Sequence, residues 1–369
     1  MMNRSNALGT ADSLKAWTVI PLLLALRIVR IWNQTGQKHA GEADIARTVL
    51  PAHNILLWLF VLATYLNVIQ RLARKAMPWA SRQLSSAASL ALGVAALGFK
   101  VAFTKADAPE LLDGLGFLVL RPMEEASLVA QARAVFFSLA IMATMTTAPT
   151  IYQRFCQDIQ TQGIGLVINR FIRQADNRFQ DISQPLHDLF TLFLMTQSRA
   201  TNIPLFLLFE GQFYSLRYLQ LSGAELTLTS LLFQHASFFA FGGSNAISSI
   251  DLSNAYNGIG GYSVGAVGVL TFCGNWAGPL WWTSAIALLL SEYARRVRQQ
   301  VWARHLSLLT TFASNDVLFV MLACTALRTH LFIWTVFSPK YLYSIAWSIG
   351  QHLCISIGYG SLLFWIGSW

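Results

Sequence analysis

The sequence predicts an all-α polytopic membrane protein with about nine to eleven transmembrane helices, some of them broken, and no soluble domain. Only 12% of its 369 residues are charged, which is about half of the ~25% that soluble domains carry. Hydrophobic residues make up 54% of the chain, and its mean hydropathy is +0.48. These apolar residues are gathered in many long runs, which indicates repeated crossings of a bilayer rather than one large soluble core.

Each predicted span is an apolar run near the ~20 residues that a helix needs to cross the hydrocarbon. In chain order the spans are 14–30, 52–70, 83–103, 134–152, 185–216, 226–241, 262–290, 308–336 and 341–365. SRATNIP interrupts 185–216 and GNWAGP breaks 262–290, so the sequence leaves open whether each is one span or two. Residues 1–13 form a short N-terminal segment, interpreted as a possible truncated start, and 14–369 form one multi-pass domain.

The distribution of charge predicts how the spans are oriented. Basic residues cluster in 71–82, 153–178 and 291–305, whereas the loop 105–125 is acidic. Because basic loops favour the cytoplasmic side, we expect them there and the acidic loop on the opposite side. The net charge of +9 comes from these membrane-flanking clusters, so no nucleic-acid partner is predicted. The membrane side of 244–257 stays open, because either span count satisfies this rule.

No catalytic or metal-binding motif occurs along the sequence. The four cysteines lack CxxC spacing, and the seven histidines lack HExxH spacing. The sequence also has no P-loop and no Gly-x-Ser-x-Gly elbow. We therefore predict no catalytic residue, no metal site and no cofactor within this chain.

A polar segment separates two apolar runs: FFAFGGSNAISSIDLSNAYNG covers 238–258. Glycines at both ends favour helix breaks, which predicts a re-entrant or rim loop. Its side chains would cap helix ends and line a pocket for a lipid headgroup. The candidate headgroup residues are Asn245, Asp251, Asn254, Tyr256 and Asn257. An ordinary connecting loop with Asx turns is the alternative.

Two pairs of residues extend this candidate site. Asn275 and Trp276 lie at the break in TFCGNWAGPLWW, where tryptophans either anchor the chain at the membrane interface or form a platform for a headgroup. Arg328 and His330 lie near the end of a later span. They are interpreted either as ligands of a phosphate or as side chains that snorkel to the interface.

Three carboxylates occur in apolar surroundings: Asp188, Glu210 and Asp316. Ionisable groups inside a bilayer are expensive to bury alone. We therefore expect each of them to be functional or paired inside the helix bundle.

Three long stretches are specific enough to indicate a family: FFAFGGSNAISSIDLSNAYNGI, LTFCGNWAGPLWW and LACTALRTHLFIWTVFSPKYLY. Together with RIWNQTGQKHAGEADIARTVLPAHN and ATNIPLFLLFEGQF, they resemble the C-terminal membrane domain of the GPI ethanolamine phosphate transferases. The fungal type 2 (PIG-G-like) enzymes are the most similar members. The resemblance covers nearly the whole chain.

This resemblance implies a multi-pass protein of the endoplasmic reticulum membrane. The family transfers phosphoethanolamine from phosphatidylethanolamine to a mannose of the GPI precursor glycolipid, the second mannose for type 2. It also implies membrane lipids and a PIG-F-like multi-pass membrane protein as partners.

The sequence departs from the family pattern at the catalytic domain. The family's luminal domain, with two zinc ions and a threonine nucleophile, is not among these residues, so no catalytic residue or zinc ligand is carried over. Activity of this chain alone is therefore not expected. The alternatives are a non-catalytic membrane scaffold and a lipid-handling transporter or flippase, which broken helices near polar residues would suit.

Overall fold

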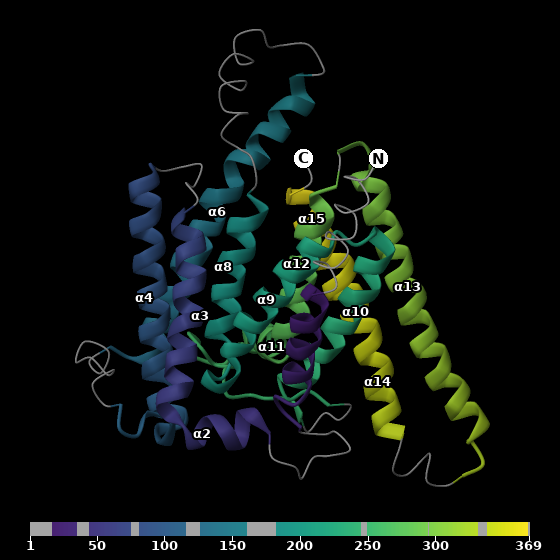
Figure 1. Cartoon of the computed structure of the whole chain (residues 1–369), viewed down its shortest axis with the longest axis horizontal. Helices are drawn as coiled ribbons and strands as arrows, with labels where there is room; N and C mark the ends of the chain where they lie inside the picture. The colour runs from purple at the N-terminus through teal and green to yellow at the C-terminus, as the bar shows by residue number, and fades with distance from the viewer. Residues whose placement is uncertain are drawn as a thin grey trace, which may run out of the picture. The chain divides into compact units, whose positions relative to one another are not determined.

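The computed structural model describes residues 17–34, 44–74, 81–115, 126–160, 182–244, 249–293, 295–330 and 338–367. Every regular element in these ranges is helical (Figure 1), which confirms the all-α prediction. Residues 1–13, Asn245, and most of the basic stretch 153–178 lie outside the described residues.

The helical elements follow in chain order. Residues 17–30 are helical. The further elements are η1 (Ile45–Val49), α2 (Leu50–Ala52), α3 (Asn54–Arg74), α4 (Arg82–Asp107), η2 (Pro109–Leu112), α6 (Leu128–Gln160), α8 (Ser183–Thr196), η4 (Ala200–Asn202), α9 (Pro204–Leu219), α10 (Gly223–Ala240), α11 (Val264–Asn275), α12 (Ala277–Ser291), α13 (Arg295–Ala326), α14 (Ser338–Gly350), η7 (Gln351–Gly360) and α15 (Ser361–Gly367).

Several of these helices are long and apolar enough to cross a membrane. Among the described residues they are Asn54–Arg74, Arg82–Asp107, Leu128–Ala148, Val297–Ala326 and Pro339–Ile366. The helices α11 and α12 are shorter and apolar. This confirms a polytopic membrane domain, while the total of about nine to eleven spans stays a prediction.

Both predicted interruptions are present. The stretch 185–216 divides into α8 and α9, joined through η4. The stretch 262–290 divides into α11 and α12 at Trp276, whose backbone leaves the helical region. One expectation is wrong: the basic stretch 291–305 is not a loop, because α13 already begins at Arg295. Residues 295–305 contain no glycine or proline and are rich in Arg and Gln, which favour helix.

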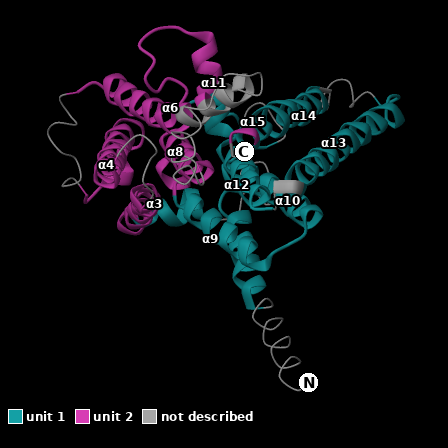
Figure 2. Cartoon of the chain, turned by 90° about the horizontal axis from the view of Figure 1, so that it is seen from above, with its two compact units in different colours: residues 1–53, 204–252, 271–364 teal, residues 54–203, 253–270, 365–369 magenta. Residues whose placement is uncertain are grey.

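The chain divides into two compact units (Figure 2). Unit 1 comprises 1–53, 204–252 and 271–364, and unit 2 comprises 54–203, 253–270 and 365–369. In unit 2, α3, α4, α6 and α8 pack together. Its predicted intramembrane carboxylate Asp188 is buried and paired with Arg71, whose Nε lies 3.0 Å from Asp188 Oδ1. The pairing predicted for this carboxylate is confirmed.

Unit 1 is built around α12, which contacts α9, α10, α13 and η7. Its side chains are buried from Ala277 to Leu290, as expected for a helix that is apolar on every face. Trp281 and Trp282 are fully buried, and their rings lie 5.5 and 5.9 Å from the ring of Phe209. The expectation that these tryptophans anchor the chain at a membrane interface is therefore wrong, because protein covers them.

The first turn of α10 predicts a dependence of stability on pH. Ser222 and Glu225 form a capping box: the Ser222 amide donates to Glu225 Oε2 (2.8 Å), and the Glu225 amide donates to Ser222 Oγ (3.4 Å). The pKa of Glu225 is lowered, mainly by the hydrogen bond from the Ser222 amide and to a smaller extent by the hydrogen bond with the Ser222 side chain. A lowered folded-state pKa adds stability above the unfolded pKa of about 4.3, and this is lost as pH falls through the folded pKa.

We therefore expect Glu225→Gln to reduce the loss of thermal stability on acidification from about pH 6 to below about pH 4. Thermal unfolding of the detergent-solubilised chain at both pH values would measure this loss. Glu110→Gln, at an exposed position, is the control and should respond to acid like the wild type. An equal acid response in Glu225→Gln and the wild type would contradict the prediction.

Candidate functional site

Asn275 fixes the polar segment to the end of α11. The Asp251 amide donates to Asn275 Oδ1 (2.7 Å), and Asn275 Nδ2 donates to the Asp251 carbonyl (2.8 Å) and the Thr271 carbonyl (2.9 Å). The side chain thus satisfies both backbone groups of Asp251 at a point where no helix can do so. Asn275 thus holds the polar segment at the end of α11. The Asp251 side chain itself is half-buried. A headgroup role for either residue stays a prediction.

Asn254 and Asn257 surround a buried cation in unit 2. Lys100 of α4 is fully buried, and its Nζ donates to the carbonyls of Thr196 (3.0 Å) and Ser198 (2.7 Å) and to Asn254 Oδ1 (3.5 Å). Asn257 Nδ2 donates to the same Asn254 oxygen (3.2 Å). Asn254 therefore helps to solvate an ammonium group of the chain itself, and Asn257 holds the Asn254 side chain in place. Lys100 is not among the residues predicted from the sequence, although a lysine within the apolar run 83–103 is a signal of such a site.

Three further predicted residues are exposed. Tyr256 exposes 55% of its surface. Arg328 and His330 follow the end of α13, and their side chains are also exposed. The structure therefore does not place these three among the buried groups around Asn254 and Asn275. Their roles stay predictions, as does that of Asn245, which lies outside the described ranges.

Trp276 belongs to an aromatic stack in unit 1. Its ring lies 4.9 Å from that of Phe272 and 4.4 Å from that of Trp347. Phe238 in turn lies 4.8 Å from Trp347. Trp276 is buried and packs against the other rings of the stack. Phe238 and Trp347 also line a surface groove.

The groove is a cavity of about 430 Å³ in unit 1, lined by α10, α13, α14 and η7. We call it the α10–α13 groove. Its polar side chains are a carboxylate, two imidazoles, three amides and three hydroxyls, interleaved with aromatic rings. They are Asp316; His235 and His352; Gln234, Asn315 and Gln351; and Ser344, Ser348 and Ser356. Because unpaired polar groups within a bilayer are costly, such a groove calls for water or a polar ligand.

A hydrogen-bond network holds the inner wall of the groove. Gln234 Nε2 donates to Ser230 Oγ (3.2 Å) and Thr283 Oγ1 (3.2 Å), and Gln351 Nε2 donates to Gln234 Oε1 (3.5 Å). These contacts tie α10 to α12 and η7 through side chains that are almost fully buried. The inner wall is therefore fixed before any ligand binds.

The side of the groove formed by α13 and α14 carries its carboxylate, Asp316. Asp316 accepts a hydrogen bond from Ser348 Oγ, and Thr310 Oγ1 lies 2.9 Å from His352 Nε2. Asp316 is exposed at the groove surface. It was predicted to be functional or paired, and Ser348 is its hydrogen-bond partner. Glu210, the third predicted carboxylate, is buried in α9.

A π-helix lines one side of the groove. Residues Gln351–Gly360 form η7, which continues α14 without a break. Gln351, His352 and Ser356 of this element line the cavity. π-Helical turns are rare and occur often at functional sites. This irregularity supports the α10–α13 groove as the site.

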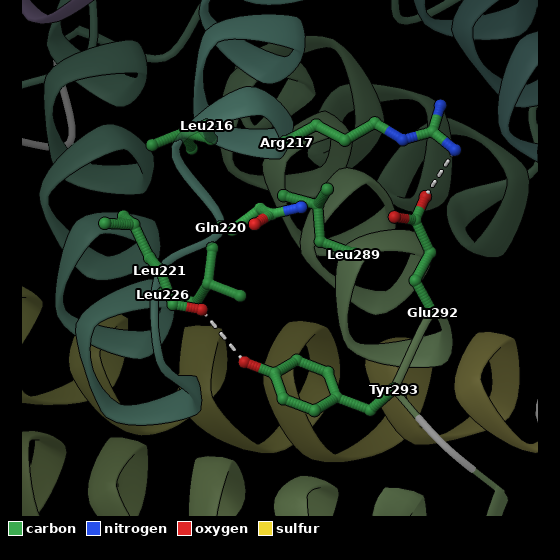
Figure 3. Close-up of a pocket in the computed structure, with 8 residues that line it drawn as sticks. All are labelled: Leu216, Arg217, Gln220, Leu221, Leu226, Leu289, Glu292 and Tyr293. Atoms are coloured by element: carbon green, nitrogen blue, oxygen red, sulfur yellow. Dashed lines mark hydrogen bonds and ion pairs between the residues drawn. The ribbon is translucent and has the colours of Figure 1, made fainter. Parts of the chain in front are cut away.

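A second cavity, of about 280 Å³, lies where α9 and α12 end (Figure 3). Arg217 Nη2 lies 2.9 Å from Glu292 Oε1, and the Tyr293 hydroxyl donates to the Leu221 carbonyl (2.9 Å). Burial, followed by the charge of Glu225, raises the pKa of the Tyr293 phenol. The polar groups of this cavity bind each other, so it is a weaker candidate than the groove.

Within the described ranges, no three His, Cys, Asp or Glu side chains gather to hold a metal ion. The groove can offer hydrogen bonds and one carboxylate, and these bind and orient a ligand. Zinc, which the resemblance places in the family's luminal domain, stays a prediction.

The fold and the groove define a helical membrane domain with a polar site between its helices. The chain belongs to the family described as the GPI ethanolamine phosphate transferase membrane region, which matches residues 1–369. It is similar to GPI ethanolamine phosphate transferase 2 of Aspergillus fumigatus, with 41% identity over 93% of this chain and 36% of that protein. The corresponding protein of Aspergillus oryzae is 39% identical over 91% of this chain and 32% of its own length.

The relative from Yarrowia lipolytica, also a GPI ethanolamine phosphate transferase 2, is 31% identical over 90% of this chain and 41% of its own length. The chain thus spans well under half of the curated relatives it matches. No solved structure matches it.

Proposed function

We propose that this chain is the membrane portion of an enzyme that transfers phosphoethanolamine from phosphatidylethanolamine to a mannose of the GPI precursor, the second mannose. The support is the similarity to GPI ethanolamine phosphate transferase 2 over 93% of the chain. The observation that carries a substrate role is the α10–α13 groove, a polar cavity between apolar helices. Substrates with acyl chains in the bilayer and polar headgroups need such a surface.

In this proposal the groove binds and orients, and phosphoryl transfer itself takes place elsewhere. Catalysis of phosphoryl transfer depends on holding donor and acceptor in line. A membrane domain contributes to this by fixing a lipid headgroup beneath the catalytic domain. We place the protein in the endoplasmic reticulum membrane with a PIG-F-like partner, and we assign zinc to a luminal domain of the whole enzyme.

Depletion of the protein in the cells that make it tests the proposal. We expect GPI precursors that lack one phosphoethanolamine to accumulate, as measured by mass spectrometry of the extracted glycolipids, and the unmodified mannose identifies the acceptor. Precursors of unchanged composition would contradict a transferase role and favour the scaffold or transporter.

Re-expression of variants tests the predicted headgroup residues in the same cells. We expect Asp251→Asn and Arg328→Gln to lower the modified fraction by about tenfold at unchanged protein levels, because each removes a charge that can bind a headgroup. Arg304→Gln, at an exposed arginine within α13, is the control and should restore modification fully. Full restoration by all three would remove Asp251 and Arg328 from the site.

A further inference from the structure

We propose that the α10–α13 groove binds the ammonium headgroup of a membrane lipid, with Asp316 as the counter-ion. This inference rests on the proposed function in one respect, that the domain handles a lipid substrate. It adds which chemical group is recognised and where.

The charge of the lining selects a cation. Asp316 is the only carboxylate among the described residues that line the groove, and neither lysine nor arginine is among them. His235 and His352 are the other ionisable groups, and the ring of His352 is engaged with the Thr310 hydroxyl. An anionic headgroup would meet the Asp316 carboxylate with neither lysine nor arginine in the lining to offset it, so the groove disfavours it.

Asp316 is held in position for a ligand. Ser348 Oγ donates to its Oδ2, which orients the carboxylate from the opposite wall of the groove. Within the described residues, Ser348 is the hydrogen-bond donor that the structure gives this side chain. The second oxygen, Oδ1, therefore can accept a hydrogen bond from a primary ammonium.

Aromatic rings supply the rest of the cation site. Phe312 and Phe319 of α13 and Trp347 of α14 line the same cavity as Asp316. Trp347 is held rigidly by Phe238 and Trp276, at 4.8 and 4.4 Å between ring centroids. Phe319 exposes 70% of its surface, so its ring lies at the open edge. Aromatic faces attract ammonium groups, and they do so more strongly where water is excluded.

The depth of the groove indicates that the ligand is a lipid. Asp316 lies ten residues before the end of α13 at Ala326, or about 15 Å along the helix axis. Ser348 lies ten residues after the start of α14 at Ser338. Counted from these helix ends, each side chain therefore lies about half of the ~30 Å hydrocarbon thickness along its helix. A carboxylate exposed at that depth needs a partner that arrives through the membrane.

The test measures which lipids the purified chain retains. The chain is exchanged into nanodiscs with equal parts of phosphatidylethanolamine, phosphatidylcholine and phosphatidylglycerol, and native mass spectrometry after gentle release counts the bound lipids. We expect phosphatidylethanolamine to be retained about tenfold over phosphatidylglycerol. Phosphatidylcholine should be intermediate, because its quaternary ammonium attracts the rings but donates no hydrogen bond to Asp316.

Asp316→Asn is the decisive variant, because it keeps the shape and the acceptor for Ser348 but removes the charge. We expect its preference for phosphatidylethanolamine over phosphatidylglycerol to fall to about onefold. Asp113→Asn makes the same charge change at an exposed residue outside the groove and should behave like the wild type. Phe319→Leu leaves the carboxylate in place and should lower the preference severalfold. It is the variant to use if Asp316→Asn does not fold.

The outcomes separate this inference from the proposed function. Equal retention of the three lipids, or an unchanged preference in both Asp316→Asn and Phe319→Leu, would overturn the ammonium site. Equal retention of phosphatidylcholine and phosphatidylethanolamine would keep the cation site and overturn the hydrogen bond to Asp316. Lipid binding is measured without any transfer reaction. If the groove selects phosphatidylethanolamine but the GPI precursors of depleted cells are unchanged, the proposed function is overturned and the ammonium site is not.

Discussion

Replacing Lys100 by methionine is expected to destabilise unit 2 by about 1 to 3 kcal/mol. The ammonium group is fully buried and donates to the carbonyls of Thr196 and Ser198 and to Asn254. Thr196 is the last residue of α8, where carbonyls lack helical partners and favour a positive charge. Methionine fills a similar volume but leaves the buried Ser198 carbonyl without the ammonium donor, while Asn257 Nδ2 still donates to Asn254 Oδ1 and to the Thr196 carbonyl.

Unfolding of the detergent-solubilised chain in denaturant would measure this loss. Lys105→Met is the matched control, because Lys105 lies one turn further along α4 with an exposed side chain. It should change stability by no more than about 0.5 kcal/mol. Equal stability of the two variants would mean that the contacts of Lys100 carry no net stabilisation. Asn254 and Asn257 would then be available for another role.

The helical architecture could be predicted because it depends on local sequence. Runs of apolar residues define α3 and α4 closely and lie within the longer α6, and SRATNIP and the Gly274–Asn275 pair mark real breaks. The error at 291–305 has a local cause as well. A cluster of basic residues predicts a loop, whereas the Arg and Gln residues of 295–305 are good helix formers and extend α13 beyond the apolar run.

The clustering of polar residues could not be predicted in the same way. Asn254 is 154 residues from Lys100, and no pattern within either segment shows that they meet. The α10–α13 groove likewise combines three segments far apart in sequence, although the single carboxylate Asp316 did indicate a site. The tryptophans after Asn275 were expected at an interface because of their chemistry, but contacts with α9 and α10 bury them.

Gly278→Ala is expected to destabilise unit 1 by about 2 to 3 kcal/mol through overpacking. A Cβ atom at Gly278 would lie 2.5 Å from Ser237 Cβ and 3.0 Å from the Ser237 carbonyl carbon. Neither atom belongs to the end of a flexible side chain, so α12 and α10 would have to separate. Small residues permit such close approach of helices in membranes. The helix α10 also carries Gln234 and His235 of the groove.

Gly268→Ala is the matched control on α11, where a Cβ would meet nothing within 4 Å. There alanine should stabilise the helix by about 0.5 to 1 kcal/mol, because it loses less conformational entropy than glycine on folding. The same substitution is therefore expected to have opposite signs at the two positions, measured by thermal unfolding in detergent. If both variants are stabilised, α12 and α10 can separate at little cost. In that case the wall of the groove on α10 would not be held rigidly by α12.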